Sequence, residues 1–491
     1  MNDRRAERWD NEHAGRPNYA WAVAGITAFA AVIRVMFLWR PPLWRDEAFT
    51  AEVVSRPSVG SMLDAVRHDS APPLSYLLLH VVAMVNSSAA SLRLVSVAAG
   101  TCAVPIAAAL GRRCGGMRAG LFAAAALAVA PAFVTSARDA RMYALATTLV
   151  MLCVLTLWRA IDAPTWGRVI THGLAVALAM YTQYFAVFAI AAALLAGIVL
   201  LGASRATAVR VTGATAAGGA TLAPWLVAAA PQFQHAATPF WVLPVGITSA
   251  VGVISQFFAG TPVDPGTPDK FALQIMQGLA IAGGVAGWLA LMVAIRRGTA
   301  HGRPAALLAA SGLGAIAILV AVSLWHPLLE ARYASVLWGP LAVLIGVGLA
   351  QLRPPIVAVA ALAAMLLSSV SLSVGHLNPD APDAAAYLNA HAGPHDYISA
   401  TAEQYQLMQY YGNARTRDDL HITADSVAWY WGTAAYPPDA VVPRVPASVA
   451  HSGGTVYTVG TATDGPPALP AGYTEHDHQC WVGICVAAYR R

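Results

Sequence analysis

Residues 20–48 read AWAVAGITAFAAVIRVMFLWRPPLWRDEA, and this stretch decides the class of fold. Its apolar part, residues 20–39, has the length that crosses the ~30 Å hydrocarbon core of a bilayer. It is too long for the apolar region of a signal peptide and lacks a small-residue cleavage site, so it predicts a membrane-spanning helix. A polar segment follows at once, with adjacent charges on Arg45, Asp46 and Glu47.

The whole chain has the composition of a membrane protein. Of its 491 residues, 57% are hydrophobic and 11% are charged, and the mean hydropathy is +0.55. Soluble proteins carry about 25% charged residues. The net charge of +5 does not predict nucleic-acid binding, because the arginines fall in short clusters between apolar runs, as they do in cytoplasmic loops.

Similar apolar runs recur along the chain and predict about eleven spans. They cover residues 20–39, 91–111, 119–135, 142–160, 168–183, 184–202, 207–229, 271–295, 304–324, 335–351 and 355–374. The arginine clusters between them share one side of the membrane if the N-terminus is cytoplasmic. Residues 72–85 are also apolar, but ~14 helical residues rise only ~21 Å. We therefore predict a juxtamembrane helix there, lying in the outer interface.

This arrangement divides the chain into three predicted parts. A cytoplasmic tail, residues 1–19, precedes a transmembrane domain, residues 20–374, whose first outer loop spans residues 40–90. An odd number of spans leaves residues 375–491 outside the cell membrane. That segment has a soluble composition, and its alternating helix-like and strand-like pieces predict a small extracytoplasmic α/β domain.

Cysteines and cofactor motifs give little support for a metal or nucleotide fold. No zinc-protease, Cys-x-x-Cys, P-loop or dinucleotide-binding motif occurs in the sequence. Cys480 and Cys485 lie close together in the C-terminal segment, where a disulfide is plausible if the compartment is oxidising.

Three polar clusters fall on the predicted outer face, and the first contains Asp46 and Glu47. These acids follow the end of the first span, at the membrane surface. Asp46 is suited either to cap a short helix over residues 47–55 or to act as a general base whose neighbour positions the substrate. The position within the loop does not decide between these readings.

The second and third clusters add arginines. Residues 136–143, SARDARMY, contain Asp139 and two arginines, and residues 325–333, WHPLLEARY, contain Arg332. Each cluster would serve either as an interfacial anchor or as an anion site, because a guanidinium fork engages two phosphate oxygens. Together the three clusters predict a pocket at the membrane surface that offers a base and phosphate-binding cations. Such a pocket suits a substrate with a lipid tail and a phosphate head.

Six short motifs occur along residues 44–333 in an order that is typical of a known family. They are WRDEA at 44–48, HDSAPPL at 68–74, SLRL at 91–94, GRR at 111–113, ARDARMY at 137–143 and ARY at 331–333. Their order resembles the GT-C superfamily of polyprenyl-phosphate-sugar-dependent glycosyltransferases. The branch that they resemble contains protein O-mannosyltransferase-like and aminoarabinose-transferase-like enzymes, of the glycosyltransferase family 39 type. The sequence departs from it at Ser70, where the family often has histidine.

The resemblance implies an α-helical polytopic fold and an inverting transfer of a sugar from polyprenyl phosphate to an acceptor hydroxyl at the outer face. It also implies the following roles: Asp46 is the general base and Glu47 its catalytic support; Arg138, Arg141 and Arg332 bind the donor phosphate with Tyr143 and Tyr333; and His68, Asp69, Asp139 and His326 orient the substrate. Because the leaving group is a phosphate anion, cations matter more than an acid. This mechanism requires no metal, although convergence of His68, Asp69 and Asp139 on a divalent cation stays open.

Several alternatives stay open at this point. Mannose is the favoured sugar, and arabinofuranose and galactofuranose stay open as alternatives. The acceptor is expected to be a protein, glycan or glycolipid at the plasma (inner) membrane. A transporter or flippase for lipid-linked sugars is the main alternative. Transporters bind near the bilayer midplane, where these spans are nearly free of charge apart from Arg34, so an interfacial enzyme is favoured. A non-catalytic scaffold that presents residues 375–491 would leave Asp46 without a role.

Overall fold

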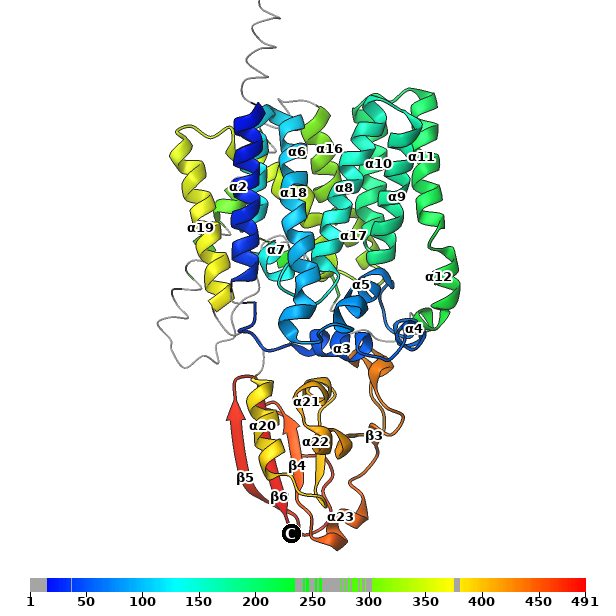
Figure 1. Cartoon of the computed structure of the whole chain (residues 1–491), viewed down its shortest axis with the longest axis vertical. Coiled ribbons are helices and arrows are strands. Elements are labelled where there is room, and N and C mark those ends of the chain that lie inside the picture. The colour runs from blue at the N-terminus through cyan, green and yellow to red at the C-terminus, as the bar shows by residue number, and fades with distance from the viewer. Residues whose placement is uncertain are drawn as a thin grey trace, which may run out of the picture.

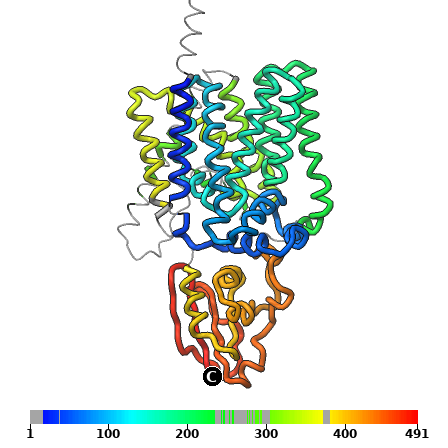
Figure 2. Tube along the Cα trace, viewed as in Figure 1, coloured from blue at the N-terminus to red at the C-terminus, as the bar shows by residue number. Residues whose placement is uncertain are grey.

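The computed structural model describes residues 16–36, 38–234, 303–374 and 380–491, with scattered positions between 242 and 296. It consists of a helical bundle and a smaller domain at one end of that bundle (Figures 1 and 2). The predicted span 271–295 lies largely outside the described residues, as does the predicted tail 1–19 for the most part.

The helices of the bundle coincide with the predicted spans that fall within the described residues. They are α2 (Arg16–Val35), α6 (Ala89–Val129), α8 (Tyr143–Asp162), α9 (Trp166–Thr182), α10 (Ala186–Leu200), α11 (Arg205–Ala220), α16 (Arg303–Ala309), α17 (Ala315–Ser323), α18 (Trp338–Leu349) and α19 (Pro355–Val374), with the short elements η2 (Ala310–Gly314) and η3 (Tyr333–Leu337) between them. Four helical runs among the described residues are long and apolar enough to cross a membrane: Pro17–Val35, Ala89–Val129, Tyr143–Asp162 and Pro304–Ser323. The total of about eleven spans stays a prediction.

The long helix α6 is two helices joined at a glycine turn. The backbone leaves helical geometry at Gly115 and Gly116, and Gly116 has a φ of +77°, a conformation that glycine adopts at no steric cost. The chain reverses there, so that a Cβ on Gly111 would collide with Ala123. The turn therefore separates two of the predicted spans and lays them side by side.

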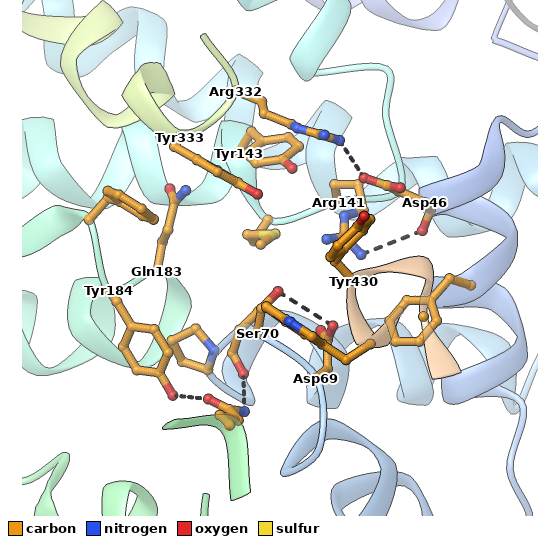
Figure 3. A pocket seen from close by; sticks show the side chains of 18 of the residues that line it. Asp46, Asp69, Ser70, Arg141, Tyr143, Gln183, Tyr184, Arg332, Tyr333 and Tyr430 are labelled. Atoms are coloured by element: carbon orange, nitrogen blue, oxygen red, sulfur yellow. Dashed lines mark hydrogen bonds and ion pairs between the residues drawn. The ribbon is translucent and has the colours of Figure 1, made fainter. Parts of the chain in front are cut away.

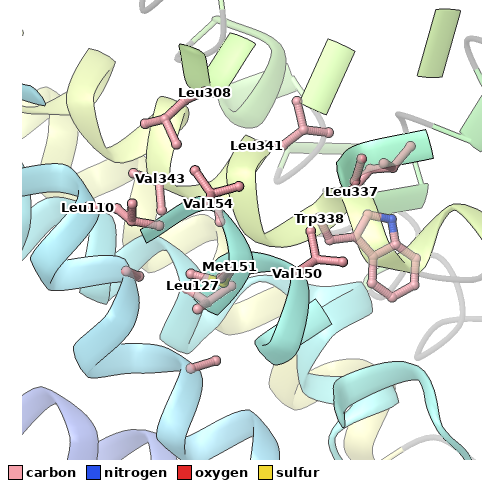
Figure 4. Packing of buried hydrophobic residues seen from close by; sticks show 14 of the residues in the cluster. Leu110, Leu127, Val150, Met151, Val154, Leu308, Leu337, Trp338, Leu341 and Val343 are labelled. Atoms are coloured by element: carbon pink, nitrogen blue, oxygen red, sulfur yellow. The ribbon is translucent and has the colours of Figure 1, made fainter. Parts of the chain in front are cut away.

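Small residues let the central helices pack closely. An added Cβ on Gly346 of α18 would collide with the backbone of Ala123 in α6, and one on Gly339 would collide with Met151 of α8. Close backbone approach of this kind is the usual way in which membrane helices gain packing energy. Leucine, valine and methionine side chains fill the remaining space around this contact (Figure 4).

Arg34 is the charged residue buried in the first predicted span, and it holds α2 against the end of α6. Its guanidinium donates to the carbonyl oxygens of Ala30, Leu127 and Ala128 at 2.9, 3.4 and 3.3 Å and lies over the ring of Phe133. The side chain is fully buried. Its hydrogen bonds are thus made within the bundle, which accounts for a charge inside an apolar span.

Short helices lie at the end of the bundle that faces the smaller domain (Figure 1). They include α3 (Arg45–Val54), α4 (Val59–Val66) and α5 (Leu74–Ala83); α7 (Pro131–Ser136), α12 (Ala223–Ala228) and α13 (Ala230–Phe233) are the other short helices of the bundle. The apolar stretch 72–85 thus forms a helix of ten residues. A helix of that length rises about 15 Å, too little to cross a bilayer.

Residues 380–491 fold into a six-stranded sheet with helices. The strands β1 (Tyr397–Ala400), β2 (Leu420–Thr423), β3 (Val441–Val442), β4 (Val456–Gly460), β5 (Thr474–Trp481) and β6 (Ile484–Arg490) lie in the order β3-β2-β1-β4-β6-β5. The first four are parallel, and β5 and β6 form an antiparallel hairpin. The helices are α20 (Ala381–His391), α21 (Tyr405–Tyr411), α22 (Ala414–Asp418) and α23 (Ala447–Ser452), with the 3-10 turns η4 (Trp429–Trp431) and η5 (Thr433–Ala435). A disulfide between Cys480 and Cys485 closes the β5–β6 hairpin.

Helix α21 attaches this domain to the bundle. The phenol of Tyr411 accepts a hydrogen bond from the backbone N–H of Leu43 at 2.7 Å, and that of Tyr410 donates to the carbonyl oxygen of Ser87 at 3.0 Å. Both partners flank the short helices of the first outer loop. The domain is therefore held over the loop that carries Asp46.

Candidate active site

A pocket of about 210 Å³ lies between the first outer loop, the ends of several bundle helices and the C-terminal domain (Figure 3). Its charged lining residues come from four separate stretches of the chain. They are Arg45, Asp46, Asp69, Arg141 and Arg332, and the neutral wall includes Ser70, Tyr143, Gln183, Tyr184, Phe185, His326, Tyr333 and residues 429–432. Residues far apart in the sequence thus share one cavity.

Asp46 lies in the first turn of α3, with both carboxylate oxygens bound by arginines. Its Oδ1 accepts hydrogen bonds from Arg45 at 2.9 and 3.0 Å, and its Oδ2 accepts one from Arg332 Nη1 at 2.6 Å. Burial opposes ionisation of Asp46, but the positive charges of Arg141, Arg332 and Arg45 outweigh it and hold the pKa of the carboxyl below its usual range. The carboxylate is therefore ionised when the pocket is empty of anions.

Arg141 closes the floor of the pocket beneath Asp46. Its Nη1 donates to the hydroxyls of Thr50 and Tyr76 at 2.9 and 3.3 Å, and its Nε has no hydrogen-bond partner among the described residues. Tyr76 in turn donates to Asp69 at 2.7 Å. Three guanidinium groups and two carboxylates line the pocket, so one positive charge is left to attract an anion such as a phosphate.

The C-terminal domain supplies an aromatic roof, residues 429–432. The Arg45 guanidinium lies over the ring of Trp431 at 4.6 Å, and the side-chain amide of Gln406 donates to the carbonyl oxygens of Trp431 and Gly432. Gly432 has a φ of +80°, and a Cβ there would collide with Gln406 and Phe49. A glycine is thus required where the roof passes closest to α3.

Glu47, although adjacent to Asp46, points away from the pocket into a buried ion pair. Its two oxygens accept hydrogen bonds from Arg93 Nε and Nη2 at 2.7 and 2.6 Å, and the backbone N–H of Ala140 donates to Oε1 at 2.8 Å. Glu47 is 1% and Arg93 2% exposed. Of the two readings left open for Asp46, the helix cap over residues 47–55 is wrong. The helix begins at Arg45, and Glu47 accepts from the backbone N–H of Trp44.

Of the residues predicted for the site, seven line the pocket. They are Asp46, Asp69, Arg141, Tyr143, His326, Arg332 and Tyr333, whereas Glu47, His68, Arg138 and Asp139 do not line it. The exposed His68 is bonded to the carbonyl oxygen of Asp64, one turn earlier. Asp139 accepts from the indole N–H of Trp44 at 3.1 Å. In the turn that carries both arginines, Arg141 rather than Arg138 faces the cavity.

His68, Asp69 and Asp139, the candidate ligands of a divalent cation, do not line one common cavity. Among the described residues, the one group of close metal-binding side chains is His478, Cys480 and Cys485, and both of its cysteines are in the disulfide. His68 and Asp139 lie outside the pocket that Asp69 lines. The described part of the chain therefore gives no support for the cation site considered from the sequence.

Asp139 gives a prediction about stability. Burial raises the pKa of its carboxyl well above the usual range, and the nearby Glu47 raises it further. The folded state therefore keeps a proton that the unfolded state loses, so the stabilisation present below the unfolded pKa is lost as pH rises towards the folded pKa. As pH rises above about 4, the ordinary pKa of an aspartate, we expect the unfolding temperature in detergent to fall more steeply in the wild type than in Asp139→Asn. Parallel curves for the two proteins would contradict this assignment.

The chain is similar to known proteins in both sequence and structure. A family model described as dolichyl-phosphate-mannose-protein mannosyltransferase matches residues 69–231. No curated protein matches the chain. ArnT from Cupriavidus metallidurans in the apo state is similar, with a TM-score of 0.64 and 16% identity over 96% of this chain and 98% of that chain. The same protein bound to undecaprenyl phosphate gives a TM-score of 0.60 at 17% identity, over 96% and 98% of the two chains.

An archaeal oligosaccharyltransferase is a more distant likeness. AglB from Archaeoglobus fulgidus, in complex with an inhibitory peptide and a dolichol-phosphate, gives a TM-score of 0.54 at 12% identity, over 80% of this chain and 63% of that chain. At these identities the likenesses show the fold, which this chain shares with ArnT and AglB. The family match over residues 69–231 and this fold confirm the resemblance to the GT-C superfamily of glycosyltransferases that the sequence motifs predicted. The membrane-length apolar helices and the shared fold indicate an integral membrane protein.

Proposed function

We propose that this protein transfers a sugar, with mannose favoured, from a polyprenyl-phosphate donor to an acceptor hydroxyl, with inversion at the anomeric carbon. The observation that carries the proposal is one carboxylate, Asp46, held among Arg45, Arg141 and Arg332 in an open pocket. A base and an anion site side by side are what displacement of a phosphate by a hydroxyl needs. The match to a family described by a mannosyl donor favours mannose.

The arginines would act mainly on the transition state. As the sugar–phosphate bond breaks, a phosphodiester with one negative charge becomes a phosphate monoester with up to two. Cations beside the leaving oxygen therefore bind the transition state more tightly than the ground state, which is the requirement for catalysis. Arg141 and Arg332 are the proposed phosphate ligands, with Tyr143 and Tyr333 as hydroxyl donors on the same wall.

Donor binding would also free the base. In the empty pocket the Oδ2 of Asp46 is bound by Arg332 at 2.6 Å, and the arginine charges depress its pKa. A phosphate that engages Arg332 neutralises one of these charges, so the pKa of Asp46 rises and the carboxylate becomes a better proton acceptor. The acceptor hydroxyl then gives its proton to Asp46 while its oxygen bonds to the anomeric carbon and the carbon–phosphate-oxygen bond breaks.

Three further residues and the C-terminal domain complete the proposal. Glu47 is proposed as a positioning residue that fixes α3 through Arg93, since it does not reach the pocket. His326 and Asp69 are proposed to orient the substrate from the pocket wall. The acceptor, a protein or a glycan, would approach beneath the C-terminal domain, whose residues 429–432 form the roof. We propose that this face is extracytoplasmic at the plasma (inner) membrane, with the N-terminus cytoplasmic.

A transporter for the same lipid-linked sugar is the alternative, and one experiment separates the two. Purified protein in vesicles is supplied with polyprenyl-phosphate mannose labelled in the sugar. The proposed enzyme releases free polyprenyl phosphate and transfers or hydrolyses the sugar, and Asp46→Asn loses this activity. Movement of intact donor between leaflets, with no cleavage in the wild type, would support the transporter and overturn the enzyme.

Arg332 provides a test of the phosphate site. Removing one charge-assisted contact with Arg332→Gln is expected to weaken binding of sugar-free polyprenyl phosphate about 10- to 100-fold. Arg332→Lys should keep part of this affinity, because it retains the charge without the bidentate fork. Arg210→Gln, at an exposed arginine of α11, is the control. Equal affinities in all four proteins would remove Arg332 from the site.

A further inference from the structure

We propose that the side-chain amide of Gln183 binds two neighbouring hydroxyls of the donor sugar, so that the enzyme selects a neutral sugar over an amino sugar. This inference rests on the proposed function and names the sugar-binding end of the same pocket.

Gln183 is a buried amide whose side chain has no hydrogen-bond partner among the described residues. It follows the end of α9, where its backbone N–H donates to the carbonyl oxygen of Ala179 and its own carbonyl accepts from Ala186. The side chain is 2% exposed, and neither its Nε2 nor its Oε1 has a hydrogen-bond partner among the described residues. Buried polar atoms are nearly always paired, so an amide at a pocket wall that has no partner in the described part of the chain is available to a ligand.

The other glutamines of the pocket lack this property. Gln232 accepts from the phenol of Tyr184 at 2.9 Å and donates to the carbonyl oxygens of Val66 and Ala71. Gln406 uses its amide to hold the roof. These two side chains have structural partners, whereas Gln183 keeps both a donor and an acceptor available to a ligand.

The surroundings of Gln183 define the chemistry of that ligand. Figure 3 shows Gln183 across the pocket from Asp46, beside Tyr333. Phe185 and Tyr333 stack here with ring centroids 5.0 Å apart, and the guanidinium of Arg332 lies 5.7 Å from the centroid of the Tyr333 ring. Figure 3 shows Asp46 across the pocket from this wall. An ammonium on the sugar would lose its hydration at this end and would face the positive charge of Arg332 rather than an opposite charge.

A neutral sugar offers partners to both the oxygen and the nitrogen of the amide. One hydroxyl donates to Oε1 and a neighbouring hydroxyl accepts from Nε2, which is the pairing that a carboxamide offers to a polyol. With the phosphate at Arg141 and Arg332 and the sugar extending to Gln183, the anomeric carbon lies between the anion site and the neutral wall. Recognition by hydrogen bonds at this wall would set sugar selectivity, while the arginines set affinity for the carrier.

The test separates sugar recognition from carrier binding. Gln183→Leu and Gln183→Glu are compared with the wild type and with Thr182→Val, whose hydroxyl bonds within α9 to Leu178 and does not line the pocket. For each protein, kcat/KM is measured with polyprenyl-phosphate mannose, and Kd is measured for this donor and for sugar-free polyprenyl phosphate.

We expect Gln183→Leu to lower kcat/KM and donor affinity about 10- to 100-fold, with the Kd for sugar-free carrier unchanged. Gln183→Glu should gain relative preference for a polyprenyl-phosphate aminopentose. Equal losses for donor and sugar-free carrier, or no loss in Gln183→Leu, would overturn the assignment. If the wild type bound the donor without turning it over, the proposed function would fail, yet the difference between the two Kd values would still test Gln183.

Discussion

Replacing Asp46 by asparagine is expected to lower kcat about 100- to 10,000-fold, the usual contribution of a general base. Asparagine keeps the size and one acceptor oxygen of the side chain but cannot take the proton of the acceptor hydroxyl. Binding of polyprenyl phosphate should persist, because Arg141 and Arg332 remain in place and lose a competing carboxylate. Turnover of a labelled donor and carrier affinity are measured on the same preparation.

Asp64→Asn is the matched control for that experiment. Asp64 lies in the same outer loop, is exposed and pairs with Arg67, so its loss removes an exposed ion pair of small energetic value. Wild-type turnover in Asp46→Asn would remove the base from the mechanism. Loss of folding in Asp46→Asn, with Asp64→Asn unaffected, would instead make Asp46 a structural residue.

Removing the carboxylate of Glu47 is expected to act on stability. Glu47→Ala leaves Arg93 as a buried charge without its partner, a change that costs about 3–5 kcal/mol when such pairs are broken. The double variant Glu47→Ala, Arg93→Ala is not expected to recover fully, because Arg93 also donates to the carbonyl oxygens of Leu38, Pro41 and Pro42. Unfolding of the detergent-solubilised variants by heat or denaturant measures the loss.

The same variants distinguish a positioning role from a catalytic one. If Glu47 fixes α3, its removal lowers the stability of the protein. Activity then falls only because Asp46 is displaced. A Glu47→Gln protein with wild-type stability and no turnover would show that Glu47 takes part in the chemistry. The expected result is the reverse: reduced stability, with part of the turnover retained in the folded fraction.

Much of the bundle and the charged half of the site could be predicted from the sequence. The length of the apolar runs predicts the membrane-spanning helices. The motifs that carry Asp46, Arg141 and Arg332 lie at helix ends, and the fold brings these ends together at one pocket. The sequence does not show which of Asp46 and Glu47 faces the pocket. Adjacent residues of a helix point about 100° apart, so one faces the pocket and the other faces Arg93. That partner is 46 residues away, and no local pattern connects it to Glu47.

The rest of the site depends on contacts that a sequence pattern does not report. The aromatic roof at residues 429–432 comes from the C-terminal domain and reaches the pocket only through the packing of α21 on the first outer loop. Gln183 had a weak signal, a polar residue at the junction of two predicted spans. Its importance follows from the absence of side-chain partners in the described structure, which only packing reveals.

The most direct test of the central claim is the anomeric configuration of the product. Wild-type protein is given a polyprenyl-phosphate sugar of known configuration and an acceptor, and the new glycosidic bond is examined by NMR. A single displacement in which Asp46 activates the acceptor hydroxyl predicts inversion, with free polyprenyl phosphate as the second product. Retention of configuration, or recovery of the intact donor, would contradict it.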